Sequence, residues 1–413
     1  MSKRKWVSGI DMSIANARYM GVVGPVEPWN EDDLVRAVRR LAARGTQTRI
    51  ALHPTTASHR WSVEPLFDDD VVAPSKELGP GGFASALEEL RRADDTRPPF
   101  RMAQVGRYIV ADIDHGLGDG KLYIDIIHAL HEDAESGWAR VPETRWAIPK
   151  AVIDTFVKHP TRLRDAVRAR AALKSLADGG ARAESTETTP WTPSVSLAVA
   201  LATKSSESEL TAWRKEHAPR TSGATMSAYL IRRAFDEVGL TVDPNVLLAV
   251  NCRRYLSPEA TVNGNFITGM SVPMPASRGV EEISGVLSQV YKSGYPLIWM
   301  TLAAALARLH KSGEPTVATE APVSPVMKLM YSDLGRPPKF SNAKWIVGAE
   351  GSEAMFTGLL DPAGPDAVTV MSGSVRGERT YSVSFHDNVF PRDLVEKALQ
   401  LVTEKPLSLL QRS

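Results

Sequence analysis

The sequence contains very little cysteine and almost no excess charge. Its one cysteine, Cys252, excludes an internal disulfide framework and any zinc site built on cysteines, and is typical of a reducing compartment. Lysine and arginine number 49 against 48 aspartate and glutamate, so the formal net charge of +1 gives no field able to hold a polyanion. Nucleic-acid or membrane-surface binding is therefore not expected as a main role, and any such contact would need a local patch.

Long apolar runs are also missing. No stretch approaches the roughly 18 residues that a membrane-spanning helix needs, and no apolar core of a signal peptide follows the basic start MSKRK. We therefore expect a cytoplasmic protein without a membrane span. The 413 residues, 43% of them hydrophobic and 23% charged, have the composition of a globular protein, and the length suits two domains.

A break in composition divides the chain near its middle. Residues 177–193 (ADGGARAESTETTPWTP) replace periodic apolar positions with Gly, Ser, Thr and Pro, as a linker does. We predict an N-terminal half over 1–176 and a C-terminal half over 194–413. Both halves mix strands and helices without strict βαβ regularity, which indicates an α/β protein of the α+β kind.

Local signals predict helices and strands in both halves. The predicted elements are a helix from Asn30 to Gly45, a strand over 107–114 with a helix over 121–130, a strand over 195–201, a helix with a capping box from Ser206 to Glu209, a helix capped by Thr225 that stops at Gly239, a buried strand over 245–250, a hairpin around Arg376 and Gly377, and a helix over 391–404.

The stretch DIDHGLGDG at 112–120 concentrates acids, a histidine and three glycines at the end of an apolar strand. As a dinucleotide loop it is weak, because its glycines give only GxGxG and Asp119 would place a carboxylate near a pyrophosphate. As a calcium loop it fails, because Gly116 occupies the third ligand position and Tyr123 stands where a bidentate acid is needed.

A catalytic base is the third interpretation of this loop. His115 follows the strand directly, and its ordinary pKa of about 6.5 leaves much of the imidazole neutral, ready to take a proton from a hydroxyl or amine. The glycines would let a substrate approach the backbone closely, and Asp119 would fix the loop. The competing interpretation is a polar turn with a solvated histidine, and the combined features favour the catalytic one.

This loop resembles the HHxxxDG motif of the CoA-dependent acyltransferase superfamily, which includes chloramphenicol acetyltransferase, nonribosomal-peptide condensation domains, polyketide-associated acyltransferases and wax ester synthases. His115, Asp119 and Gly120 match its second His, its Asp and its Gly. The first His of the pair is replaced by Asp114. Chloramphenicol acetyltransferase-like members also carry a single catalytic His, so we expect the replacement to be tolerated.

The resemblance continues in the second half of the chain. The helix that follows the linker in that superfamily is similar to TSGATMSAYLIRRAFDEVGL, and its strand carrying Asn-x-Arg is similar to VLLAVNCRRYL. A Gly-Asn segment of wax ester synthases is similar to GNFITGMSVPMP. A DFG-type motif is similar to YSDLG, although its aromatic is missing at Leu334. The residues that this carries over are Asn251, Arg253, Gly264, Asn265, Pro275, Asp333 and Gly335.

The resemblance implies two chloramphenicol-acetyltransferase-like halves packed as a pseudodimer around a central channel. It further implies transfer of an acyl group from a CoA or carrier-protein thioester to a hydroxyl or amine, with His115 as general base and with Asp119 paired to Arg253 for structural support. Backbone N–H groups of the glycine-rich turn or a hydroxyl near Ser332 are the candidate oxyanion donors. No metal or redox cofactor is implied, because the thioester is a substrate.

Two rival functions remain open. The enzyme could form amides as a free-standing condensation domain of a natural-product pathway, or the chain could be a carrier-binding pseudoenzyme, since the paired His is lost and the DFG-type motif is degenerate. A dinucleotide-binding oxidoreductase ranks third. The basic stretch 158–176, with Arg164 and Arg168, is more simply a solvated helix face than a docking site for an anionic phosphopantetheine donor or an acidic carrier protein.

Other reactive side chains have plainer interpretations. His128 and His131 lack the further ligands that a metal site requires. Cys252 is expected to be a packed thiol, and Ser372 and Ser374 do not form GxSxG and are assigned to a hairpin.

Overall fold

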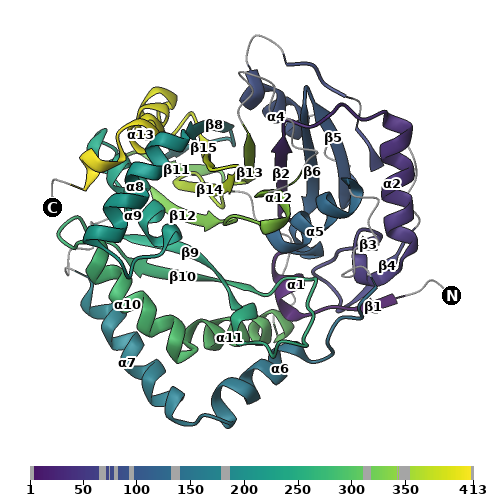
Figure 1. The fold of residues 1–413 in the computed structure, drawn as a ribbon, viewed down its shortest axis with the longest axis horizontal. Helices are drawn as coiled ribbons and strands as arrows, with labels where there is room; N and C mark the ends of the chain where they lie inside the picture. Colours follow the sequence, from purple (N-terminus) through teal and green to yellow (C-terminus); the bar gives the residue numbers. More distant parts are fainter. Residues whose placement is uncertain are drawn as a thin grey trace.

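Two β-sheets that lie side by side form the centre of the protein (Figure 1). The computed structural model describes residues 4–64, 71–73, 75–78, 82–92, 97–131, 140–177, 187–309, 318–341, 343 and 354–410. Within these residues no helix is both long and apolar enough to cross a membrane.

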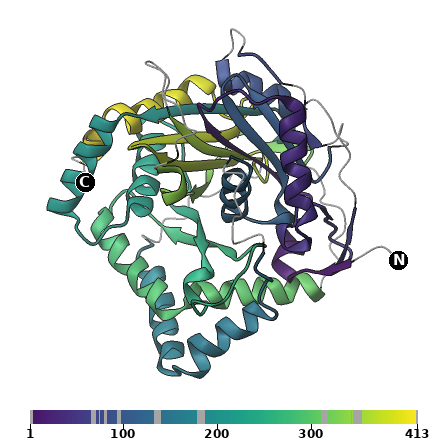
Figure 2. The same cartoon turned by 45° about the vertical axis from the view of Figure 1, so that its right-hand side comes forward.

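The first sheet has four antiparallel strands in the order β13-β2-β6-β5. Its strands are nearly continuous apolar runs because both faces are covered, one by α2 and α5 and the other by α4. Figure 2 brings this sheet and α2 forward. The bounds are β2 Arg18–Gly24, β5 Phe100–Val105, β6 Tyr108–Asp114, β13 Met355–Leu360, α2 Glu31–Ala43, α4 Gly82–Arg92 and α5 Gly120–His131.

The second sheet has six strands in the order β10-β9-β12-β14-β15-β8. Strand β12 runs parallel to β9 and β14, and the other neighbours are antiparallel. Helices α9 and α13 bury their apolar faces against it, and α8 lies beside them. The bounds are β8 Val195–Ala202, β9 Asn245–Asn251, β10 Ile267–Pro273, β12 Lys328–Asp333, β14 Ala367–Val375, β15 Glu378–His386, α8 Lys204–His217, α9 Gly223–Glu237 and α13 Arg392–Glu404.

A layer of helices closes the lower edge of the molecule in Figure 1. Helix α7 packs against α10, and α11 packs against α1 and α6. A small sheet β1-β4-β3 and a two-stranded ribbon of β7 and β11 complete the described fold. The bounds are α1 Gly9–Ser13, α6 Ala147–Val152, η4 Ile153–Val157, α7 Thr161–Ser175, α10 Val280–Ser293, α11 Tyr295–Leu309, α12 Pro338–Ser341, β1 Arg4–Trp6, β3 Leu52–His53, β4 Arg60–Val63, β7 Thr188–Pro190, β11 Glu320–Pro322 and η6 Pro406–Leu409.

Several predicted elements are confirmed. The side chain of Asn30 caps α2, β6 runs directly into the turn before α5, and α13 lies where a last helix is expected. Ser372 and Ser374 lie in the predicted hairpin, in which β14 pairs with β15.

Two predicted helix caps are wrong by three residues. Thr203, not Ser206, caps α8, and Ser222, not Thr225, caps α9. In each case the cap hydroxyl accepts a hydrogen bond from the backbone N–H of the residue that we expected to be the cap. Strand β9 also has exposed residues on one face, so it is not the fully buried strand that its composition indicates.

The two halves of the chain exchange elements. Strand β13 follows the six-stranded sheet's β12 in sequence but pairs with β2 of the four-stranded sheet. Helix α7 precedes the composition break and packs against α10, which follows it. Part of the linker expected at 177–193 lies outside the described residues, and Thr188–Pro190 form β7. The boundaries at 176 and 194 stay a prediction.

Candidate active site

The turn between β6 and α5 carries the predicted catalytic histidine. Asp114 ends the strand and caps the short helix η2, His115–Leu117: its Oδ1 accepts the N–H of Gly116 at 2.8 Å and its Oδ2 the N–H of Asn16 at 3.1 Å. Burial raises the pKa of Asp114 to about 6. The acid that replaces the first His of the motif therefore shapes the turn that presents the second.

His115 is half-buried and fixed through its backbone. Its N–H donates to the carbonyl of Ala17 at 2.7 Å, and its carbonyl accepts the side-chain amide of Asn265 at 2.7 Å. Its ring contacts Tyr19 edge to face, with centroids 5.0 Å apart. Burial lowers the pKa of His115, although the carboxylate of Asp119 acts in the opposite direction. The imidazole is therefore mainly neutral at neutral pH, as a general base must be.

The predicted contact between Asp119 and Arg253 is present. Nη1 of Arg253 lies 2.7 Å from Oδ2 of Asp119, whose carboxylate also accepts the N–H of Phe266 and of Lys121, each at 3.1 Å. Burial acts to raise the pKa of Asp119, but the charge of Arg253 and these hydrogen bonds outweigh it and hold the pKa below its usual value. Asn251 caps the turn that carries Arg253 by accepting its N–H at 2.9 Å.

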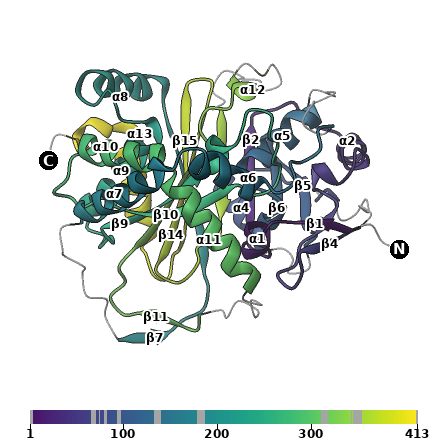
Figure 3. The same cartoon turned by 90° about the horizontal axis from the view of Figure 1, so that it is seen from below.

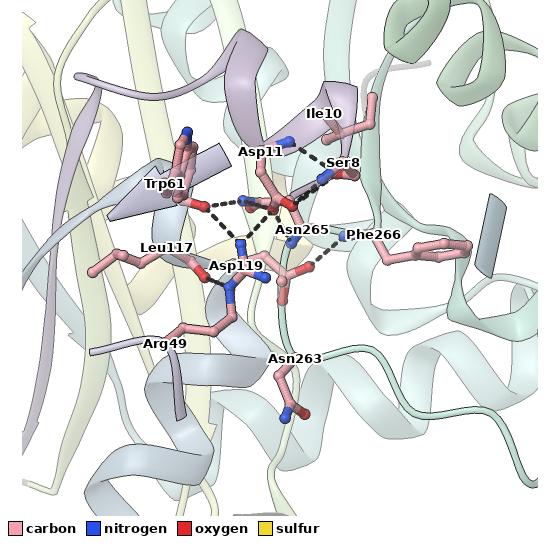
Figure 4. Close-up of polar contacts among 12 residues, drawn as sticks. Ser8, Ile10, Asp11, Arg49, Trp61, Leu117, Asp119, Asn263, Asn265 and Phe266 are labelled. Atoms are coloured by element: carbon pink, nitrogen blue, oxygen red, sulfur yellow. Dashed lines mark hydrogen bonds and ion pairs between the residues drawn. The ribbon is translucent and has the colours of Figure 1, made fainter. Parts of the chain in front are cut away.

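A second buried cluster supports the same turn (Figure 4); the family resemblance names its member Asn265, and Asp11, Arg49 and Glu143 are not predicted. Asp11 lies at its centre: Oδ1 is 3.1 Å from Nη2 of Arg49 and accepts the backbone and side-chain amides of Asn265 at 2.9 and 3.0 Å. Arg49 in turn donates to the carbonyl of Gly116 at 3.3 Å and to that of Leu117. Each carbonyl of the turn from 115 to 117 thus accepts a hydrogen bond from a buried side chain.

Glu143 completes this cluster. Its Oε1 lies 3.4 Å from Nη1 of Arg49 and accepts the N–H of Asn263 and of Gly264, each at 3.0 Å, and Lys5 pairs with its other oxygen. Burial acts to raise the pKa of Glu143, but Arg49 and Lys5 lower it to about 2. Residues 263–266, from the second half of the chain, therefore clamp a turn that belongs to the first.

The glycines of the turn are needed for packing, which differs from the expectation that they admit substrate. A Cβ at Gly116 would lie 2.8 Å from the Trp61 ring, and one at Gly118 would lie 2.6 Å from Leu122. A Cβ at Gly120 would lie 2.7 Å from Leu334, which comes from the loop after β12. Protein atoms occupy the space that these glycines leave.

Asp333 and Gly335 form a separate cluster. Asp333 Oδ1 accepts the N–H of Gly335 at 2.7 Å and lies 3.4 Å from Nη1 of Arg379, whose Nε pairs with Glu207 at 3.3 Å. Gly335 has a φ of 73°, a left-handed conformation that favours glycine. The cluster ties β12 to α8, and Leu334, between Asp333 and Gly335, lies beside Gly120 of the His115 turn.

The remaining candidates are dispersed. Arg164 and Arg168 are exposed on α7, which packs on α10 rather than on the His115 turn. Cys252 is buried, which raises its pKa to about 12. The ring of His131 contacts that of Trp29 in a tilted arrangement, and burial lowers the pKa of His131 to about 4. Among the described residues, no group of three or more His, Cys, Asp or Glu side chains is arranged to hold a metal ion.

Of the candidate oxyanion donors, the backbone N–H groups of Gly116 and Gly118 are already engaged. Gly116 donates to Asp114, and Gly118 donates to the carbonyl of His115 at 3.2 Å. Ser332, the other candidate, is half-buried near the end of β12.

Asn265 provides a test of the clamp. Replacing Asn265 with Ala removes hydrogen bonds to the carbonyl of His115 and to Asp11, and we expect a loss of about 1–3 kcal/mol in the free energy of unfolding because buried partners lose their donor. Denaturant unfolding measures this loss. Asn388→Ala, which removes an exposed amide bonded to the carbonyl of Thr192, is the control and should cost much less. Equal losses would mean that Asn265 does not support the turn.

Comparison with known proteins gives no match to a family model and no match among curated sequences. Solved structures do match. The TRI3 trichothecene 15-O-acetyltransferase from Fusarium sporotrichioides has a TM-score of 0.63 at 11% identity, over 98% of this chain and 95% of that one. The epimerization domain of the third module of tyrocidine synthetase B has a TM-score of 0.58 at 13% identity, over 100% of this chain and 98% of that one.

The condensation domain of the monacolin K polyketide synthase MokA matches with a TM-score of 0.57 at 11% identity, over 99% of this chain and 98% of that one. At such identities the likeness establishes the fold, and it extends over nearly the whole of each of these three proteins. The chain therefore has the fold of these acetyltransferase, epimerization and condensation domains, a pseudodimer of chloramphenicol-acetyltransferase-like halves, as the resemblance of its sequence implies.

Proposed function

We propose that the protein transfers an acyl group from a CoA or carrier-protein thioester to a hydroxyl or an amine, with His115 as general base. The observation that carries the proposal is the histidine itself: half-buried, with its pKa lowered by burial, on a turn whose carbonyls are all held by buried side chains. The acetyltransferase and condensation domains among the structural neighbours support transfer chemistry on this fold.

In the proposed reaction, Nε2 of His115 takes the proton of the acceptor as its oxygen or nitrogen attacks the thioester carbonyl. The tetrahedral intermediate then expels the thiolate, which receives the proton back from the imidazolium. The N–H groups of Gly116 and Gly118 already donate within the turn. The other backbone N–H groups of the glycine-rich turn and a hydroxyl near Ser332 stay the candidates for stabilising the oxyanion. The thioester is a substrate, and this chemistry requires no resident metal or redox cofactor.

Two alternatives follow from specific observations. Amide formation is favoured by the likeness to the nonribosomal peptide synthetase FmoA3, a longer chain of which the match covers 43%. A carrier-binding pseudoenzyme is favoured by Asp114, which stands in place of the first His of the motif.

The experiment that tests the proposal is mass spectrometry of the products formed from a panel of acyl-CoA donors, each offered to alcohol and amine acceptors. An acylated acceptor that requires both the enzyme and His115 supports the proposal and distinguishes an ester from an amide. Absence of any acyl transfer or thioester hydrolysis across the panel, with carrier-bound donors included, would favour the pseudoenzyme.

The pH dependence of transfer follows from the lowered pKa of His115. A general base works in its neutral form, so activity falls as pH drops through its pKa, and burial moves that pKa below 6.5. We expect kcat/KM to be flat near neutral pH with its acid limb below pH 6.5.

Asp114, with a pKa of about 6, titrates in the same window and must be separated from His115. The Asp114→Asn variant should keep the acid limb while lowering the rate through the disturbed cap. If the acid limb of the kcat/KM profile disappeared in this variant, the limb would report the titration of Asp114 rather than that of His115.

A further inference from the structure

Exposed apolar side chains are concentrated on one side of the molecule. Fourteen large hydrophobic side chains are exposed within the described residues, and nine of them lie either on α11 or in the segment that runs from Trp146, just before α6, through α7. We call this surface the α6–α7–α11 face; its exposed apolar residues are Trp146, Ile153, Val157, Leu163, Val167, Ile298, Trp299, Leu302 and Leu306. Figure 3 views the molecule from this side.

The three helices form a continuous surface. Helix α11 contacts both α6 and α7, and α7 contacts η4, which continues α6. The inner sides of these helices are buried around residues such as Ala151, Phe156 and Met300. The exposed apolar residues therefore lie on the outer sides of the helices. Trp146 is 71% exposed and Val167 is 70% exposed. A clustered apolar surface of this kind marks an interaction site more often than chance exposure.

Trp146 is also held in an unusual backbone conformation. It precedes α6 with a φ of 58°, in the left-handed region that non-glycine residues rarely adopt. Such local strain is concentrated at functional positions. Here it presents the largest of all side chains to the solvent.

The same surface is strongly basic. From Arg145 to Lys174 the chain carries eight lysine and arginine residues and two aspartates, in a protein whose overall net charge is +1. Arg164, Arg168 and Lys174 are exposed on α7 beside Leu163 and Val167. Exposed tryptophan and aliphatic side chains together with Lys and Arg are the composition of helices that lie in a membrane interface.

We propose that the α6–α7–α11 face binds the surface of a membrane containing anionic lipids, with the apolar side chains entering the interface and the basic residues of α7 contacting the head groups. A second copy of this chain fits less well, because in a two-fold contact this basic face would meet the same basic face of its copy. An acidic carrier protein would match the arginines but would leave apolar side chains on three helices without a role. The proposal does not rest on the acyl-transfer function.

Vesicle flotation of the full chain tests the proposal. We expect binding to vesicles of phosphatidylcholine mixed with phosphatidylserine, weakened by salt, and much less binding to phosphatidylcholine alone. Arg164→Glu combined with Arg168→Glu should lower the partition coefficient about tenfold or more. Lys215→Glu combined with Lys397→Glu, on α8 and α13, makes the same change of charge elsewhere and should retain most of the binding.

The contribution of the apolar side chains to vesicle binding is tested with a second pair of double variants. Leu163→Ser combined with Val167→Ser should lower binding severalfold, whereas Leu78→Ser combined with Val323→Ser, also exposed but outside this face, should not. Thermal melting confirms that each variant is folded.

Failure of the parent protein to bind anionic vesicles, or equal losses in test and control variants, would overturn the proposal. If vesicles are not bound but the Arg164→Glu, Arg168→Glu variant raises KM for a carrier-bound donor, the face is a carrier-docking site. Vesicle binding is measured without any thioester, so its failure is distinct from failure of the proposed reaction.

Discussion

Replacing His115 with Ala should lower acyl transfer by about 10² to 10⁴ and leave the protein folded, because general-base catalysis typically contributes that much. The backbone N–H and carbonyl of residue 115 hold the turn through Ala17 and Asn265, and these bonds do not need the imidazole. The variant loses mainly the ring contact with Tyr19. Steady-state kinetics with a saturating thioester measures the fall in kcat, and a thermal melt reports the fold.

The control for this experiment is a histidine in the same part of the fold that the proposed chemistry does not use. His131 lies at the end of α5, where its ring contacts that of Trp29, and His131→Ala should leave kcat near that of the parent. A His115→Ala variant with the turnover of the parent would remove His115 from catalysis. If His115→Ala failed to fold, the imidazole would be shown to support the turn. The kinetics of His115→Gln would then be compared with those of the parent.

The sequence predicts the local elements around the site because their signals are local. The apolar run of β6, the glycines after it and the helical spacing of α5 stand within 24 consecutive residues, from 108 to 131. The cap at Asn30 is read in the same way. The capping errors at Thr203 and Ser222 show the limit of this reasoning, because several Ser and Thr residues stand close together there and each could serve.

Apart from Asn265, which the family resemblance names, the supporting cluster could not be predicted, because its members meet only through the tertiary fold. Asp11, Arg49 and Glu143 lie far apart in sequence, and nothing in the pattern around Arg49 or Glu143 distinguishes them from surface charges. The Ser8–Asp11 capping box was the one available local signal, and it indicates only a helix start. Strand β13 is similar: its apolar pattern predicts burial but not which sheet it joins.

The contact between Asp119 and Arg253, which the family resemblance implies, leads to the largest stability effect that we expect. The two side chains are 3% and 14% exposed, so removing either partner leaves a charge without its counterion in a buried site. Asp119→Ala and Arg253→Ala should each lower activity and also cost about 3–5 kcal/mol in the free energy of unfolding, whereas His115→Ala should lower activity and leave the fold stable. Denaturant unfolding of the two variants measures the loss.

The double variant should lose much less than the sum of the single losses, because neither charge is then left alone. The ion pair between Arg278 and Glu282 is the matched control: its N–O distance of 2.8 Å is close to the 2.7 Å of the buried pair, but its side chains are 35% and 48% exposed. Its double-mutant cycle should give a coupling of about 0–1 kcal/mol. Similar couplings in the two cycles would mean that burial does not strengthen the Asp119 contact.

The pH dependence of this stabilisation has a definite sign. The folded-state pKa of Asp119 lies below its usual 3.8, so the contribution of the ion pair is fully present above that value and is lost as pH falls through the lower, folded pKa. The difference in stability between the parent and Asp119→Ala should therefore be constant from neutral pH down to about pH 5 and shrink below pH 4. A difference that stayed constant through this acid range would show that Asp119 supports the turn through its shape and hydrogen bonds rather than its charge.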